Sequence, residues 1–105
     1  MEILIVTFPL DGMTDSEYAE MAEQIAPAIS AVPGLQSKVW LADESAHVYG
    51  GVYTFDTHEA LVAYTGSELV AKAAATPGLG EFTVRSFEVL DAPSAVTRGL
   101  TLASA

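Results

Sequence analysis

The chain has 105 residues, half of them hydrophobic, and its 14 acidic and four basic residues give a formal net charge of −10. This length suits one domain around a single core, and the apolar content excludes an intrinsically disordered chain. The negative charge repels phosphate groups, so we expect neither nucleic-acid binding nor docking on an anionic membrane. Cysteine is absent, which excludes disulfides, thiolate metal sites and a cysteine nucleophile.

The first residues are apolar but carry no positive charge, and Pro9, Asp11 and Gly12 interrupt the apolar run. This pattern differs from that of a secretory signal peptide. No apolar run approaches the roughly 20 residues that span a bilayer. We therefore expect a soluble, cytoplasmic protein.

The first part of the chain has the pattern of a strand followed by a helix. Residues 2–8 are rich in β-branched side chains and end at turn-forming residues, which predicts a strand. Thr14 and Glu17 have the spacing of a helix capping box, and apolar residues then recur every three or four positions up to Pro33. Pro27 lies inside this helix, where we expect a kink around a pocket mouth rather than an end.

Three further strands and a second helical region follow. Residues 35–42 and 47–55 read as strands joined by a short polar turn, as in a hairpin. A helix is expected after Thr57, with an interruption at Gly66 and a continuation over residues 68–75. The last strand is expected at residues 81–90.

The order βαββαβ predicts a ferredoxin-like α+β fold, in which an antiparallel four-stranded sheet carries both helices on one face. We expect a single domain over residues 1–105, with residues 91–105 as a C-terminal tail. Alternate residues of a strand point to opposite faces of the sheet, and in these strands neither group of alternate residues is polar. Two helices, however, can cover only one of the two faces. A second layer is therefore needed, and we predict a homodimer formed through a two-fold axis.

Two of the four basic residues lie on predicted strands. Lys38 and Arg85 have these positions, whereas Lys72 lies on an expected exposed helix and Arg98 in the tail. In so acidic a chain, an anionic reaction intermediate needs a local cation. We prefer Arg85 as the catalytic cation, because a planar guanidinium can stack on an aromatic substrate and bind its oxygen, and we expect Lys38 to be a substrate-binding residue.

Aromatic side chains and a histidine on the same strands complete the candidate site. Trp40, which shares the parity of Lys38, offers a flat wall, and Tyr53 offers a hydroxyl for a developing oxyanion. Tyr49 and His47 share the strand and parity of Tyr53, and His47 can move protons. The set predicts a pocket between sheet and helices for a flat, partly polar molecule, whereas each residue alone also fits ordinary core packing. No metal site is expected, because the histidines lack ligand spacing.

Several short motifs follow one another in a characteristic order. They are Met21-Ala22-Glu23-Gln24-Ile25-Ala26-Pro27, Pro33-Gly34-Leu35, Lys38-Val39-Trp40, Gly50-Gly51-Val52-Tyr53-Thr54-Phe55, Ala63-Tyr64, Phe87-Glu88-Val89 and the tail from Ser94 to Arg98. In this order the sequence resembles the YdhR-type putative monooxygenases. The resemblance implies a dimeric α+β barrel packed sheet to sheet. It also implies a relationship to small monooxygenases that oxidise phenolic or quinol-type substrates without metal or flavin.

Three functional hypotheses follow. The first is a cofactor-independent monooxygenase, in which a deprotonated aromatic substrate passes an electron to dioxygen while the protein orients it and stabilises the anion. The second is a small-molecule-binding module without turnover, and the third is a lyase or cyclase that needs only acid–base groups. Haem degradation would require an axial ligand, for which His47 and His58 are candidates.

Overall fold

In the computed structural model, which describes residues 1–99, four strands form one antiparallel sheet in the order β2-β3-β1-β4. Their bounds are β1 (Glu2–Pro9), β2 (Leu35–Asp43), β3 (Val48–Phe55) and β4 (Thr83–Glu88). Strand β1 pairs with both β3 and β4, and β2 pairs with β3. This order confirms the predicted ferredoxin-like fold.

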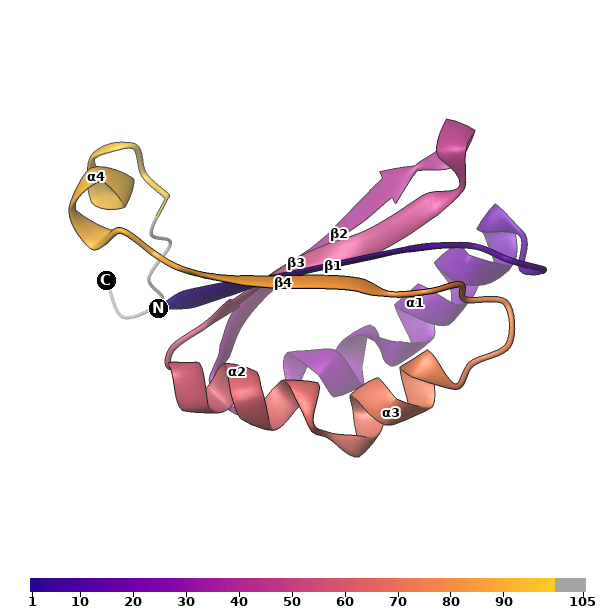
Figure 1. Ribbon diagram of the computed structural model, residues 1–105, viewed down its shortest axis with the longest axis horizontal. Helices are drawn as coiled ribbons and strands as arrows, with labels where there is room; N and C mark the ends of the chain where they lie inside the picture. Colours follow the sequence, from indigo (N-terminus) through magenta and orange to yellow (C-terminus); the bar gives the residue numbers. More distant parts are fainter. Residues whose placement is uncertain (100–105) are drawn as a thin grey trace.

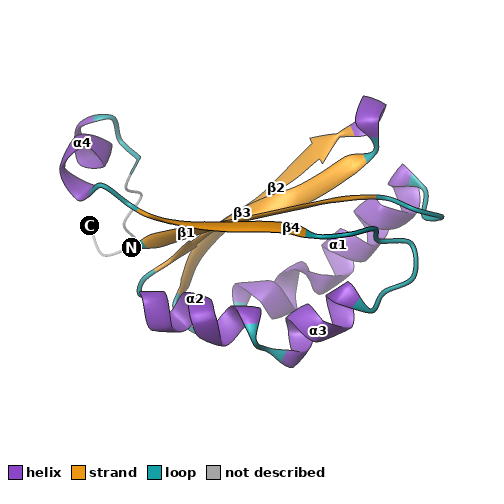
Figure 2. Cartoon of the chain, viewed as in Figure 1, coloured by secondary structure: helices purple, strands orange, loops and turns teal. Residues whose placement is uncertain are grey.

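Three helices cover one face of the sheet, as Figures 1 and 2 show. They are α1 (Asp15–Ser30), α2 (His58–Thr65) and α3 (Glu68–Ala74). A fourth helix, α4 (Asp91–Val96), follows β4 and lies beyond one end of the sheet. The predicted tail therefore begins with a helical turn, and residues 100–105 lie outside the described part. None of the helices in residues 1–99 is long and apolar enough to cross a membrane.

The ends of the helices follow from local sequence. The Thr14 hydroxyl accepts from the Glu17 backbone N–H at 3.1 Å, and the Glu17 carboxylate accepts from the Thr14 N–H at 2.8 Å. The predicted capping box is thus confirmed. Helix α1 continues through Pro27 to Ser30, as expected. A 3-10 turn, η1 (Glu44–Ala46), joins β2 to β3 where the sequence predicts a hairpin.

The inner face of the sheet, which the helices cover, holds the core. Leu4 and Phe55 are almost fully buried there. Residues paired across neighbouring strands point to the same side of a sheet, so the register places side chains in rows. One inner row contains Lys38, Tyr53, Leu4 and Ser86, and the next contains Trp40, Gly51, Val6 and Val84.

The outer face of the sheet has no helical cover in residues 1–99 (Figure 2). Its central row runs through Val39, Val52, Ile5 and Arg85. Val39 is 59% exposed and Phe87 is 42% exposed. The structure thus confirms that a largely apolar sheet face is left open, and the partner that covers it stays a prediction.

Candidate active site

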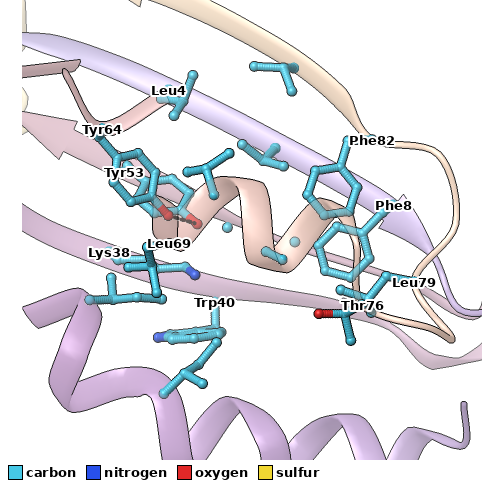
Figure 3. Close-up of a pocket in the computed structure, with 18 of the residues that line it drawn as sticks. Leu4, Phe8, Lys38, Trp40, Tyr53, Tyr64, Leu69, Thr76, Leu79 and Phe82 are labelled. Carbon is cyan, nitrogen blue, oxygen red and sulfur yellow. Dashed lines mark hydrogen bonds between the residues drawn. The ribbon is translucent and has the colours of Figure 1, made fainter. Parts of the chain in front are cut away.

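A cavity of about 240 Å³ lies between the inner face of the sheet and the helices (Figure 3). Strands β1 to β4 form its floor, and α1, α2 and α3 form its roof. An apolar cavity of about 150 Å³ is large enough for one benzene molecule. The cavity therefore suits a molecule of about two fused rings.

Lys38 extends along the floor of this cavity between two aromatic rings. Its Nζ lies 3.4 Å from the centre of the Trp40 ring and 4.5 Å from the centre of the Tyr53 ring. A Cβ atom at Gly51 would lie 2.5 Å from the Lys38 Cε, so the missing side chain makes room for the lysine stem. Burial lowers the pKa of Lys38 to about 8. The ring faces attract the ammonium and partly replace its lost hydration.

Two tyrosine hydroxyls meet in the same cavity. Tyr53 on β3 and Tyr64 on α2 share a hydrogen bond of 3.1 Å, and their ring centres are 5.1 Å apart. Burial raises the pKa of both phenols, so both stay protonated at neutral pH and can donate hydrogen bonds. The predicted site omitted Tyr64. Its position three residues after the buried Leu61, on the same helix face, is the signal that identifies it.

The charges around the cavity differ from those of the molecule as a whole. Among the described residues that line it, there is no carboxylate and no histidine. The basic groups are Lys38 on the floor and Lys72, an exposed residue of α3. A chain with a net charge of −10 therefore presents a cationic pocket to a ligand.

The predicted placement of Arg85 in this pocket is wrong. Arg85 pairs with Ile5 in the register of β1 and β4, which puts it on the outer face of the sheet. There its guanidinium lies 4.9 Å from the centre of the Phe87 ring. Its neighbour Val84 points inward and lines the cavity. Of the two strand cations predicted for the site, only Lys38 lines the cavity.

His47 and Tyr49 are not among the residues that line the cavity. His47 has a left-handed backbone conformation with φ of 55° at the end of η1, and its Nδ1 lies 3.2 Å from the Asp15 carboxylate at the surface. Tyr49 belongs to a second core cluster, where its ring centre is 4.7 Å from that of Tyr18. Of the six predicted site residues, the structure therefore brings together Lys38, Trp40 and Tyr53.

His58, the second histidine, does not line the cavity either, and its Nδ1 is 2.8 Å from the Glu2 carboxylate. Within residues 1–99, no group of three or more histidine, aspartate or glutamate side chains is arranged to hold a metal ion. The polar groups of the lining are two lysine amines, three tyrosine phenols, two threonine hydroxyls and the Trp40 indole.

Comparison with known proteins agrees with this architecture. Residues 3–100 match the family described as "Putative mono-oxygenase ydhR". The match includes all of the sheet except Glu2, and the three helices that surround the cavity. Among proteins with a curated function, none matches this sequence.

Several solved structures share the fold at low sequence identity. A Streptomyces coelicolor monooxygenase, solved in complex with nanaomycin D, has a TM-score of 0.66 and 22% identity, with coverage of 87% of this chain and 88% of the other. SnoaB, a cofactor-independent oxygenase from Streptomyces nogalater, has a TM-score of 0.67, 17% identity and coverage of 86% and 94%. The heme-degrader MhuD from Mycobacterium tuberculosis has a TM-score of 0.68, 19% identity and coverage of 86% and 96%.

Proposed function

Because the chain belongs to the ydhR family of putative mono-oxygenases, we propose that it oxygenates a small phenol- or quinol-type aromatic substrate with dioxygen, without metal or flavin. The substrate occupies the pocket between the sheet and the helices. The observation that carries the proposal is the Lys38 amine, which is held between two aromatic rings in a cavity of about two-ring size. A flat molecule with one acidic oxygen complements such a pocket in shape and charge.

Lys38 in its protonated form binds the phenolate oxygen of the substrate. Coulomb attraction is stronger in the apolar cavity than in water, so the pair lowers the pKa of the bound phenol. The resulting phenolate is electron-rich enough to pass an electron to dioxygen. A quinol supplies all the electrons that the reaction needs, because quinol plus O₂ gives hydroxyquinone plus water with atoms and electrons balanced.

Trp40 and the tyrosine pair have complementary roles. The indole of Trp40 holds the flat ring system, and the Tyr53–Tyr64 pair donates a hydrogen bond to the negative charge that develops on oxygen. SnoaB, a cofactor-independent oxygenase, has the same fold, which supports a reaction of this kind.

The test is oxygen uptake with a panel of benzoquinols and naphthoquinols. Lys38→Met and Tyr53→Phe should each lower kcat/KM by about 30- to 1000-fold, since each removes an interaction of about 2–4 kcal/mol with developing charge. Tyr49→Phe is the matched control, because Tyr49 lies on the same strand and face but not in the cavity lining. Its rate should stay at the wild-type value.

The outcomes separate the hypotheses. If Lys38→Met and Tyr53→Phe both fold and both take up oxygen at the wild-type rate, the proposed site is refuted. Tight binding of quinols without oxygen uptake or any chemical change would support a binding module, and conversion without oxygen uptake would support a lyase or cyclase. Haem degradation needs an axial ligand, and neither His47 nor His58 lines the cavity.

The proposal includes a homodimer formed through the outer face of the sheet. The central row of that face combines Val39, Val52 and Ile5 with Arg85. A second copy presents the same face, so a two-fold contact covers both apolar surfaces at once. This arrangement leaves the pocket of each protomer on the far side of its own sheet.

A further inference from the structure

The Lys38 amine has a second chemical capacity, which oxygenation does not use. Both ion pairs found within residues 1–99 involve histidines, and Lys38 takes part in neither. The lysine contacts ring faces instead of a carboxylate. An ammonium without a carboxylate partner in an apolar site loses its proton more readily than one in water.

The protonation state makes the free amine available near neutral pH. Burial lowers the pKa of Lys38 to about 8. An ordinary lysine has a pKa of about 10.4, so at pH 7 Lys38 has roughly 200 times the usual fraction of free base. A desolvated lysine of this kind is the usual nucleophile toward carbonyl compounds.

The rest of the cavity suits the same reaction. Figure 3 shows the amine of Lys38 and the hydroxyls of Tyr53 and Tyr64 on one side of the cavity. Beyond them, the lining is mainly apolar and includes Phe8 and Phe82, whose rings stack with centres 4.9 Å apart. An apolar carbonyl compound can thus place its rings near the phenylalanines and its carbonyl group near the amine.

We propose that Lys38 binds apolar aromatic aldehydes and ketones covalently, as an imine within this cavity. The Nζ lone pair attacks the carbonyl carbon, and a proton moves from nitrogen to the carbonyl oxygen through a tyrosine hydroxyl. The carbinolamine then loses water, so that a C=N bond replaces the C=O bond. No electron is transferred and no further reactant is required.

This activity does not depend on the proposed oxygenation. The protonated lysine binds a phenolate, whereas the free amine binds a carbonyl carbon, and pH selects between the two forms. The two ligand classes compete for one cavity. Each proposal can therefore fail while the other stands.

The experiment is reductive trapping of the full chain with 2-naphthaldehyde and sodium cyanoborohydride under nitrogen, followed by peptide mass mapping. The chain has only two lysines, Lys38 and Lys72, so Lys72 and the N-terminal amine act as internal references. At pH 7 we expect Lys38 to be labelled at least about tenfold faster than Lys72. The labelling rate should rise with pH to a midpoint near the Lys38 pKa of about 8.

Two further arms test the site itself. An excess of 2-naphthol should protect Lys38 more strongly than Lys72, because Lys38 is held on the cavity floor between two rings whereas Lys72 is an exposed residue of α3. Lys38→Arg keeps the positive charge but should lose the fast adduct. Labelling that is equal at Lys38 and Lys72, or a fast adduct that persists in folded Lys38→Arg, would overturn the proposal. Oxygen uptake measured on the same samples reports separately on oxygenation.

Discussion

His58 and Glu2 form the shorter of the two histidine–carboxylate pairs in residues 1–99. Glu2 belongs to the inner row of the sheet with Phe55, and its side chain is only 14% exposed. The hydrogen bond that the Glu2 carboxylate accepts from the imidazole, together with its negative charge, raises the pKa of His58 above the ordinary value. The pair thus ties the first residue of α2 to the edge of the core.

Stability should depend on pH through this pair. A histidine with a raised pKa stabilises the fold fully below its unfolded pKa of about 6.5, and this contribution is lost as pH rises through the folded value. Glu2→Gln should therefore lower the free energy of unfolding more at pH 5.5 than at pH 8.5. Urea unfolding at the two pH values measures this difference.

Titration by NMR gives the direct test. Glu2→Gln should move the pKa of His58 down toward its ordinary value, whereas Asp15→Asn, which removes the carboxylate beside His47, should leave the His58 titration unchanged. An unchanged His58 titration in Glu2→Gln would show that the ion pair has no effect in solution.

At the scale of the strand, Gly50 and Gly51 in β3 are each needed for a different reason. A Cβ atom at Gly50 would fall on the backbone of Val6 and Thr7 in the neighbouring strand. At Gly51 it would meet the flexible stem of Lys38. The first clash involves backbone that cannot move without distorting the sheet, and the second involves a side chain that can.

Gly50→Ala should accordingly destabilise the fold by about 1–3 kcal/mol, the usual cost of overpacking. Gly51→Ala should cost less but should displace the Lys38 amine and slow its trapping by 2-naphthaldehyde. Thermal melts and the trapping rate separate the two effects. Equal stability of the two variants, or unchanged trapping in Gly51→Ala, would contradict this reading.

At the scale of the whole molecule, the proposed dimer depends on the open face of the sheet. We expect light scattering to show a dimer at micromolar concentration. Val39→Glu, on the outer face, should shift the chain toward monomer because it places a charge in the proposed contact. Val62→Glu is the matched control, since Val62 on α2 is 50% exposed and away from that face. A wild-type monomer at micromolar concentration would refute the dimer.

The sequence by itself determined the order of the elements and most of their ends. Alternation and β-branched side chains indicate the strands, and the Thr14–Glu17 capping box marks the start of α1 because its hydrogen bonds are local. Lys38, Trp40 and Tyr53 were predicted as site residues from their chemical types, and the cavity contains all three. The short helix α4 was missed, because residues 91–96 have no clear apolar period.

Only the tertiary structure decided which face of each strand meets the helices. Both parities of β4 mix polar and apolar side chains, so the sequence alone cannot orient this strand. The pairing of Arg85 with Ile5 places the guanidinium outside, and the packing of α2 on the sheet brings Tyr64 to Tyr53. Register and helix packing are long-range properties, because they depend on contacts between segments far apart in the chain. For this reason, Lys38 lies on the floor of the pocket and Arg85 does not.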